Sequence, residues 1–340
     1  MKLPDCAQKA IEMIEQNSCE AYLVGGCVRD MVMGKAQNDI DITTNMLPDK
    51  IEELFSHYKT IGIGKKHGTI TVFIDNVPLE ITTYRIESGY EDNRHPSNVC
   101  FTKTLKEDLS RRDFTMNALC YNDKSGLVDE FFGIQDIQNK CIRAIGEPKK
   151  RFSEDALRIL RAFRFMAQLS FSIEESTKSE LYECRELLQN ISAERVTVEL
   201  TKLLLSDKPV CTLRLMNELC VLENILKPLS QKEFVAIENS NPIIEIRLAL
   251  ALKKEGLDYL CVDKKTKDRT KMLWANQQFK IHPDKQSIKQ KLNKLSYEGV
   301  LLLLDYQALL GEDVKEQRKL TLEIERTGEC YSLKQLKISG

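Results

Sequence analysis

Strand-forming patterns lie almost entirely within the first 145 residues, whereas amphipathic helical patterns dominate the rest of this 340-residue chain. The segment DIDITT at 39–44 alternates polar and apolar residues, as a half-buried strand does. Two further runs, GTITVFID and VPLEITTYR, are rich in β-forming residues and meet at Asp75 and Asn76, which predicts a hairpin. We therefore expect an α/β head followed by an all-helical body.

Helical patterns become dominant from SEDALRILRAFRFMAQL, residues 153–169, onward. Two more amphipathic segments follow, IEESTKSELYECRELLQ and SAERVTVELTKLLL, and each of the three has a Ser or acidic residue near its start that can cap a helix. Residues 3–16 show the same apolar spacing, and AYLVGG after them indicates a short strand ending in a glycine turn. The chain is expected to continue as helices through residue 340.

The composition is that of an ordinary globular protein, with 42% apolar and 30% charged residues. It contains no run of about 18 uncharged apolar residues, so we expect no membrane span, and the amphipathic, acidic start does not resemble a secretory signal. Eleven cysteines without a CxxC pair favour free thiols and a cytoplasmic location over a disulfide framework or a zinc ribbon. The four histidines lack metal-pair spacing, which argues against a histidine-based metal site.

Charge is unevenly distributed, although the formal net charge is only −1. The stretch 253–294 contains twelve Lys and Arg against five Asp and Glu. Such a stretch can follow a nucleic-acid backbone, and it can equally be the solvated face of a helix. Composition alone leaves both interpretations open.

Asp39 and Asp41 form a D-x-D pair on the predicted strand. Residues two apart on a strand face the same side, so both carboxylates project together while Ile40 and Ile42 face the core. Two like charges this close are stable chiefly with a divalent cation between them. Carboxylate oxygens suit Mg²⁺, which commonly takes its remaining ligands from water and phosphate. A solvated strand face with two aspartates is the alternative.

Gly25 and Gly26 form a turn between the first predicted strand and a helix. Because glycine has no Cβ atom, backbone N–H groups there can closely approach an anion. Arg29 follows on the expected first turn of the helix, a position that also favours phosphate. A structural turn with an Arg29–Asp30 pair is the simpler alternative. A glycine turn, an arginine and a D-x-D pair within 17 residues nevertheless supply both halves of a metal–triphosphate site.

The combination LVGGCVRDMVMG and DIDITT resembles the signature of the class II CCA-adding enzymes, which are tRNA nucleotidyltransferases, and of their bacterial poly(A) polymerase relatives. Three later segments resemble that family's further motifs in order and spacing: EDLSRRDFTMNALCY at 107–121, RFSEDALRILRAFRF at 151–165 and ISAERVTVELTKLL at 191–204. The resemblance covers nearly the whole chain. It implies an α/β head of the polymerase-β-like nucleotidyltransferase type, followed by an all-helical neck and body.

The segment RRDFTMNA offers two guanidinium forks that can bind phosphate or ribose oxygens. By residue type alone, a surface salt-bridge cluster at the start of a helix fits equally well. In the family that the chain resembles, this motif contributes ribose and triphosphate contacts. The resemblance assigns those contacts to Arg112, Asp113 and Asn117.

The helix expected at 153–169 carries one apolar stripe, with Glu154, Arg158 and Arg161 on the opposite side and Asp155 flanking them. Asp155 and Arg158 are three residues apart, so on a continuous helix they can touch. Phe165 falls in the middle of the charged side. A purely solvated face would not favour a phenyl ring there.

By resemblance, Asp155 and Arg158 select the incoming base. We further expect phosphate to be bound by Gly25, Gly26, Arg29, Arg112 and Arg161. The chemistry fits, because a carboxylate accepts from an exocyclic amine and a guanidinium donates to a ring nitrogen or a carbonyl. Cytosine and adenine both present an amino group beside an acceptor, whereas uracil and guanine present a carbonyl there. One Asp–Arg pair could therefore accept CTP and ATP and reject UTP and GTP without a template.

The polar stretch 85–98 is expected to be a loop, resembling the family's flexible element between the catalytic and ribose motifs. Relatives that add only two cytidines have a shorter element, so its full length favours addition of the terminal A as well. His95 stands where relatives often carry Arg, next to Arg94. Glu80 is either a third carboxylate of the site or a structural residue, and both interpretations stay open.

The resemblance predicts three parts: a catalytic nucleotidyltransferase head at 1–145, a helical neck at 146–208 that selects the base, and a helical body with a partial tail at 209–340 that binds tRNA. The predicted activity is template-independent addition of CCA to the 3′ end of tRNA from CTP and ATP, with release of pyrophosphate. Asp39 and Asp41 would hold two Mg²⁺ ions, and the basic stretch would contact the acceptor end and T arm of tRNA.

An A-adding or CC-adding enzyme, or a bacterial poly(A) polymerase, would share all these motifs. A catalytically silent RNA-binding paralogue is disfavoured, because such a copy would have no reason to keep every charged residue at these spacings. No feature of the sequence indicates an oligomeric state.

Overall fold

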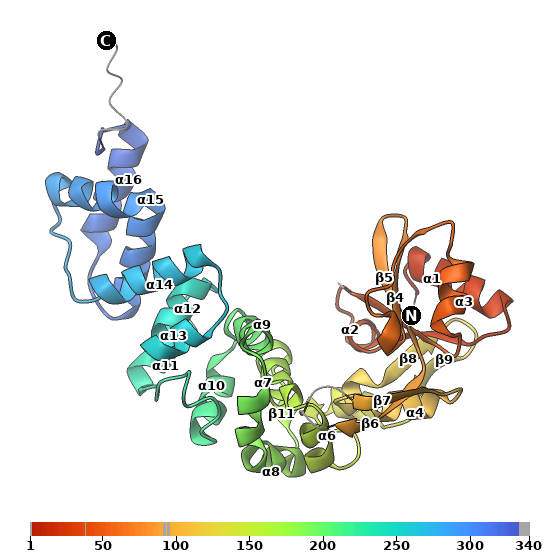
Figure 1. The fold of residues 1–340 in the computed structure, drawn as a ribbon. Helices are drawn as coiled ribbons and strands as arrows, with labels where there is room; N and C mark the ends of the chain where they lie inside the picture. The colour runs from red at the N-terminus through yellow and green to blue at the C-terminus, as the bar shows by residue number, and fades with distance from the viewer. Residues whose placement is uncertain (1, 38, 91–92, 94–95, 333–340) are drawn as a thin grey trace. The chain divides into compact units, whose positions relative to one another are not determined.

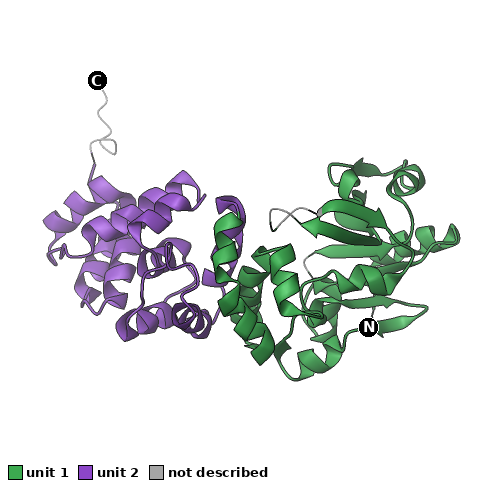
Figure 2. Ribbon diagram, turned by 60° about the horizontal axis from the view of Figure 1, so that its bottom comes forward, with its two compact units in different colours: residues 1–191 green, residues 192–340 purple. Residues whose placement is uncertain are grey.

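The structure, a computed structural model, describes residues 2–37, 39–90, 93 and 96–332. It separates into two compact units, residues 1–191 and residues 192–340 (Figures 1 and 2). Within the described residues, every strand lies in the first unit and the second unit is helical, which confirms the predicted order of an α/β head and a helical body. The division into head, neck and body at 145 and 208 remains a prediction.

A seven-stranded sheet forms the framework of the first unit, in the strand order β3-β4-β5-β2-β1-β8-β9. Its strands are β1 Ala21–Val24, β2 Ile40–Thr44, β3 Lys59–Ile61, β4 Thr69–Ile74, β5 Val77–Thr83, β8 Leu119–Asn122 and β9 Gly126–Asp129. The central strand β2 contains Asp41, with Asp39 directly before it, and pairs antiparallel with β1 and parallel with β5. Ile42 on β2 is fully buried as predicted, but Thr43 and Thr44 are fully buried as well and Ile40 is only partly buried. The strand is therefore confirmed, whereas its predicted half-buried alternation is wrong for its second half.

The predicted hairpin is formed by β4 and β5, which pair antiparallel through Ile74 and Val77. Asp75 and Asn76 between them have φ values of 50° and 64°. Both are left-handed conformations that Asp and Asn tolerate and that a two-residue hairpin turn requires.

Helices cover the sheet and continue beyond it within the first unit. They are α1 Asp5–Gln16, α2 Gly26–Val32, α3 Pro48–Leu54, η1 Lys65–His67, α4 Leu105–Ser110, η2 Thr115–Asn117, α5 Gly133–Gln138, α6 Pro148–Glu154, α7 Leu157–Leu169, α8 Glu175–Glu183 and η3 Arg185–Asn190. A small parallel sheet of β10 Cys141–Ile142 and β11 Ser172–Ile173 joins the end of the head to the helices that follow.

The expected loop at 85–98 is instead largely a hairpin, so that prediction is wrong. Strands β6 Arg85–Tyr90 and β7 Pro96–Phe101 pair antiparallel as a separate two-stranded sheet. Its polar sequence does not mark a loop, because Glu87 is largely buried and accepts hydrogen bonds from Arg85 and Tyr90 within the same strand. Arg94 and His95 lie outside the described residues.

The single helix expected at 153–169 is interrupted at Asp155, which corrects the prediction that Asp155 and Arg158 share one helix. Helix α6 ends at Glu154, Asp155 is extended with φ −140° and ψ 101°, and α7 begins at Leu157. The Asp155 side chain accepts a hydrogen bond from the Leu157 N–H at 3.1 Å. Its competition for a backbone donor ends one helix and starts the next.

The second unit consists of eight α-helices in its described part: α9 Ala193–Leu204, α10 Val210–Glu218, α11 Gln231–Asn239, α12 Ile244–Ala251, α13 Lys254–Tyr259, α14 Lys264–Asn276, α15 Lys285–Leu309 and α16 Lys315–Thr327. Arg247 on α12 is almost fully buried and donates to the carbonyls of Leu204, Ser206 and Ser240. It thereby satisfies carbonyls at the ends of α9 and α11. None of the helices in the described ranges combines the length and the apolar character that a membrane crossing requires.

Candidate functional site

The two aspartates of the D-x-D motif lie at the start of the central strand. Asp39 is exposed, Asp41 is partly buried, and Glu80 on β5 is the register partner of Asp41. Parallel register partners face the same side of a sheet, so Glu80 lies beside Asp41. Among the described residues, no group of three His, Cys, Asp or Glu side chains is placed to hold a metal ion. The two aspartates offer the oxygen ligands that Mg²⁺ prefers, and Mg²⁺ usually adds waters and phosphate oxygens to such a pair.

The surroundings of Asp41 disfavour the ionised form of its carboxylate. Burial raises the pKa of Asp41 to about 6, the Arg112 guanidinium opposes that rise, and Glu80 and Asp39 add to it. Removal from water and two like charges thus outweigh the nearest cation. A bound cation would relieve this arrangement.

The glycine turn lies against the same strand. Gly25 has φ +82°, a conformation that L side chains rarely adopt. A Cβ atom at Gly25 would lie 3.3 Å from Nη1 of Arg112 and 3.9 Å from Oδ2 of Asp41. The structure therefore brings three predicted site residues, from three separate segments of the chain, to one place.

A second group of predicted site residues forms a buried hydrogen-bonded chain. Arg29 donates from Nη1 to Oδ1 of Asn117 at 2.8 Å, and Asn117 donates from Nδ2 to Oδ1 of Asp113 at 3.0 Å. Asp113 also accepts from Nε and Nη2 of Arg161, at 2.7 and 2.6 Å. Burial alone would raise the pKa of Asp113, but Arg161 and the hydrogen bond from Asn117 lower it to about 2. Asp113 is therefore an ionised anchor for Arg161 rather than an exposed group.

Arg158 is held by the protein itself. It donates from Nη1 to the Arg151 carbonyl and to Oε2 of Glu154, each at 3.1 Å, and from Nη2 to the Arg111 carbonyl at 2.7 Å. The ion pair recorded for Arg158 is thus with Glu154, whereas the sequence favoured contact with Asp155. Asp155 lies between the two helices at the foot of α7.

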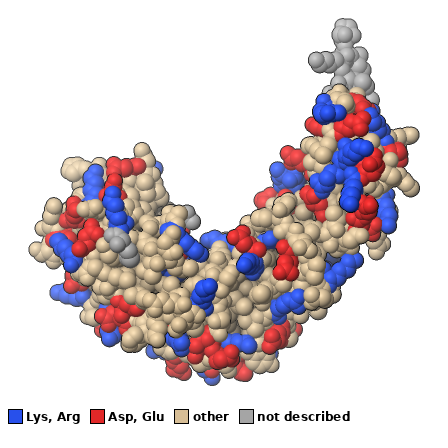
Figure 3. Space-filling model, turned by 180° about the vertical axis from the view of Figure 1, so that it is seen from behind, with Lys and Arg blue, Asp and Glu red and all other residues tan. Residues whose placement is uncertain are grey.

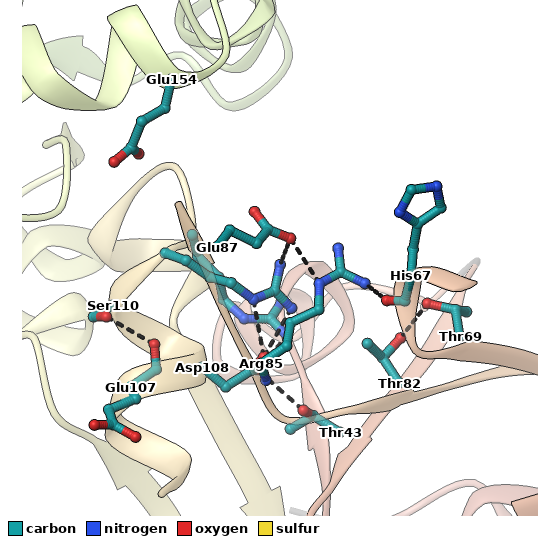
Figure 4. Close-up of polar contacts among 12 residues, drawn as sticks. Thr43, His67, Thr69, Thr82, Arg85, Glu87, Glu107, Asp108, Ser110 and Glu154 are labelled. Atoms are coloured by element: carbon teal, nitrogen blue, oxygen red, sulfur yellow. Dashed lines mark hydrogen bonds and ion pairs between the residues drawn. The ribbon is translucent and has the colours of Figure 1, made fainter. Parts of the chain in front are cut away.

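A fully buried carboxylate that the sequence analysis did not single out joins these segments. Asp108 on α4 accepts hydrogen bonds from the Thr43 hydroxyl at 3.0 Å and from the Arg85 backbone N–H at 3.3 Å (Figure 4). It also accepts from Nε and Nη2 of Arg111 at 3.0 and 2.8 Å, and from Nη2 of Arg112 at 3.4 Å. Asp108 therefore connects β2, the β6–β7 hairpin and the RRDF segment.

Glu87 is the second carboxylate that connects these segments by hydrogen bonds. Its Oε1 accepts from Nε of Arg85 at 2.6 Å and from Nη1 of Arg111 at 3.3 Å, and its Oε2 accepts from the Tyr90 hydroxyl at 2.6 Å. Burial by itself raises the pKa of Glu87, but the two arginines outweigh it and the net shift is downward. For Asp108 the sequence does contain a local signal, because Arg111 and Arg112 follow it at three and four residues. The contact of Glu87 with Arg111 spans 24 residues and leaves no local pattern.

Two family matches cover parts of both units. Residues 21–143 match the family described as "Poly A polymerase head domain", and residues 170–232 match the one described as "Probable RNA and SrmB- binding site of polymerase A". The predicted site residues Gly25, Asp41, Arg112 and Asn117 lie within the first match.

Curated relatives match a little over half of the chain. A CCA-adding enzyme of Lactobacillus helveticus (strain DPC 4571) is 47% identical over 205 residues, which are 59% of this chain and 51% of that protein. A CCA-adding enzyme of Geobacillus sp. (strain WCH70) is 50% identical over 194 residues, 57% of this chain and 48% of that protein. The chain thus spans about half the length of the curated relatives it matches.

Solved structures match over a longer range. The Bacillus stearothermophilus CCA-adding enzyme in complex with CTP superposes with a TM-score of 0.83 at 29% identity, covering 100% of this chain and 86% of the other. A tRNA nucleotidyltransferase complexed with a primer tRNA and an incoming ATP analog gives a TM-score of 0.72 at 25% identity, covering 94% and 99% of the two chains. Both family matches, the curated relatives and the fold agree, and residues 21–143 and 170–232 belong to the family of tRNA nucleotidyltransferases and poly(A) polymerases.

Proposed function

We propose that this protein adds CCA to the 3′ end of tRNA, one nucleotide at a time, from CTP and ATP and without a nucleic-acid template. The observation that carries the proposal is the meeting of Gly25, Asp41 and Arg112 at one end of the central strand. A carboxylate pair, a backbone turn open to an anion and a guanidinium are the parts that nucleotidyl transfer needs. The names of the relatives, CCA-adding enzymes, point to the same reaction.

The mechanism assigns a distinct task to each group of residues. Asp39 and Asp41 would hold two Mg²⁺ ions, which supply a lowered pKa for the primer 3′-hydroxyl and charge neutralisation on the triphosphate. Arg29, Arg112 and Arg161 orient the triphosphate, and Gly25 lets it approach the backbone. Asp113 and Asn117 position two of these arginines, since Asp113 accepts a hydrogen bond from Arg161 and Asn117 accepts one from Arg29.

Base selection is assigned to Asp155 and Arg158 at the junction of α6 and α7. The junction supports this role because the Asp155 backbone is extended and its carboxylate accepts a hydrogen bond from the Leu157 N–H, which fixes its position. A carboxylate and a guanidinium held there can distinguish cytosine and adenine from uracil and guanine by the amino group that only the first two present in that position.

The tRNA is assigned to the second unit through the basic stretch 253–294, with the acceptor end and T arm as the predicted partners. In Figure 3, basic and acidic side chains intermingle on the visible face of the helical part. Six of the twelve basic residues form ion pairs with carboxylates: Lys267, Arg269, Lys271, Lys280, Lys285 and Lys289. Lys264 and Lys265, both exposed at the start of α14, are therefore the better candidates for phosphate contacts. The free cysteines support the proposed cytoplasmic location.

The metal-binding part of the proposal is tested by removing both carboxylates. We expect the double variant Asp39→Ala, Asp41→Ala to fold and to bind tRNA as the wild type does, but to release no pyrophosphate from CTP in the presence of tRNA and Mg²⁺. Pyrophosphate release at the wild-type rate by the double variant would show that the two aspartates do not hold the catalytic metal.

A further inference from the structure

Phe165 on α7 is almost fully buried, yet its ring contacts the guanidinium groups of three arginines. Its ring is 5.2 Å from the guanidinium carbon of Arg29, 5.4 Å from that of Arg161 and 4.3 Å from that of Arg164. All three distances are within the range of cation–π attraction, which reaches to about 6 Å from the ring centroid. The ring also packs edge-on against Phe114 of the RRDF segment, with centroids 5.9 Å apart and planes at 88°.

The ring contacts two arginines of the proposed phosphate site that are also connected to each other by hydrogen bonds. Arg29 reaches Arg161 along its hydrogen-bonded edge, through Asn117 and Asp113. Phe165 lies against the guanidinium groups of the same two arginines. Each guanidinium is thus held both at its edge and by an aromatic ring, which limits its rotation.

Arg29 retains donors for a ligand in this arrangement. Its recorded hydrogen bonds go from Nε and Nη2 to Asp30 and from Nη1 to Asn117. These use three of the five N–H groups of a guanidinium. Because the ring contacts Arg29 without taking a hydrogen bond from it, Phe165 positions the arginine and leaves its remaining donors available.

A neighbouring phenylalanine shows what a purely structural ring looks like on this helix. Phe163 on α7 is fully buried, and Phe165 is 5% exposed. Among the described residues, the recorded cation–π contacts of α7 go to Phe165 and none goes to Phe163. Both rings are buried, but only Phe165 contacts arginines among the described residues, so comparing variants of the two separates the effect of core packing from the effect of arginine contact.

We propose that Phe165 is a positioning residue that holds Arg29 and Arg161 in the orientation that binds the nucleotide triphosphate. This inference rests on the proposed function, since it assumes that the two arginines bind phosphate. Phe165 acts through the triphosphate, which CTP and ATP share, so its loss weakens the binding of both nucleotides by the same factor. A residue that acts on base selection would change the ratio of the two affinities.

The test measures CTP and ATP binding by isothermal titration in the presence of Mg²⁺, with the full chain. Phe165→Leu removes the ring, Phe165→Tyr keeps it, and Phe163→Leu removes the neighbouring ring as the matched control. We expect Phe165→Leu to weaken both nucleotides about three- to tenfold and Phe165→Tyr to bind within about twofold of the wild type. Phe163→Leu should lower the melting temperature at least as much as Phe165→Leu and leave both affinities unchanged.

Three results would overturn the inference: equal affinities in Phe165→Leu and wild type, an equal loss in Phe163→Leu, or a loss confined to one nucleotide. If Phe165→Leu does not fold, Phe165→Met replaces it, because the flexible thioether fills the space without an aromatic face. A wild-type protein that binds neither nucleotide would contradict the proposed function, and this inference with it. Wild-type binding that Phe165→Leu retains would contradict the inference alone.

Discussion

Asp41 is the residue whose environment is most informative about what the protein needs. Its pKa is raised to about 6, mainly by burial, from about 3.8 for an ordinary aspartate. Below pH 4 the carboxyl is protonated in both the folded and the unfolded chain and contributes nothing to the pH dependence. Above pH 6 it is ionised in both, and the folded state carries the penalty of a desolvated charge.

We therefore predict that Asp41→Asn stabilises the metal-free protein at pH 7.5. The 3.8-to-6 shift corresponds to at most about 3 kcal/mol of unfolding free energy, and the gain should fade as the pH is lowered from 6 to 4. Urea unfolding in EDTA at pH 7.5 and pH 4.5 measures it. Added Mg²⁺ should stabilise the wild type more than the variant. An Asp41→Asn protein no more stable than wild type at pH 7.5 would contradict the predicted burial of an unfavourable charge.

Asp108 is a second residue with a measurable role, because it is the buried counter-charge of Arg111 and Arg112. Asp108→Asn keeps the shape and removes the charge, leaving two largely buried guanidinium groups without it. We predict a loss of about 3–5 kcal/mol in unfolding free energy, measured by urea unfolding. The control is Glu107→Gln, which changes the exposed neighbour and should stay within about 0.5 kcal/mol of wild type.

At the scale of secondary structure, local patterns predicted the elements whose formation depends on local contacts. The D-x-D strand was predicted because its polar and apolar residues alternate, and the β4–β5 hairpin because Asp75 and Asn76 suit its turn. The contacts of the site were only partly predictable. The residue types of Gly25, Arg29 and Arg112 indicated anion binding, but the hydrogen-bonded chain through Asp113 and Asn117 depends on the fold of the whole unit.

Both errors in element prediction involve a partner that is distant in the sequence, and the helix break also involves a local cap. Residues 85–90 look like a loop because they are polar, yet β6 pairs with β7, and its Glu87 accepts a hydrogen bond from Arg111, 24 residues away. The helix at 153–169 looks continuous because its apolar spacing continues. It breaks where the Asp155 side chain caps Leu157 and where the Ala156 N–H donates to the Asn93 carbonyl. A local pattern cannot contain partners that the fold brings in from elsewhere.

The β6–β7 hairpin should depend on Glu87 more than on its own backbone pairing. We predict that Glu87→Gln speeds amide hydrogen exchange of β6 and β7 about tenfold, because two charge-assisted bonds are weakened. Exchange in β4 and β5 should not change. Tyr90→Phe, which removes one neutral donor to Glu87, is the matched control and should have the smaller effect. Equal exchange rates in wild type and Glu87→Gln would show that the hairpin does not need this carboxylate.

At the scale of the whole molecule, nucleotide and RNA binding are assigned to different units. All the proposed nucleotide-binding residues lie in residues 1–191, and the basic stretch lies in residues 192–340. Changes in one unit should therefore alter one kind of binding and leave the other intact.

We predict that Lys264→Ala with Lys265→Ala raises the KM for tRNA and lowers the slope of log binding constant against log salt by up to about two. The CTP dissociation constant should not change. The matched control is Lys267→Ala with Lys271→Ala on the same helix, whose ammonium groups already pair with Asp258. An equal effect of both pairs would mean that only the net charge of α14 matters.

The most direct test of the proposed function is a nucleotide-addition assay with a tRNA transcript that lacks its last three nucleotides. The transcript is incubated with CTP alone, with ATP alone and with both, and the products are resolved at single-nucleotide length. The proposed function predicts two additions with CTP and a third only when ATP is also present. Addition that stops after two cytidines with both nucleotides present, or a long tail with ATP alone, would contradict it and identify a CC-adding enzyme or a poly(A) polymerase instead.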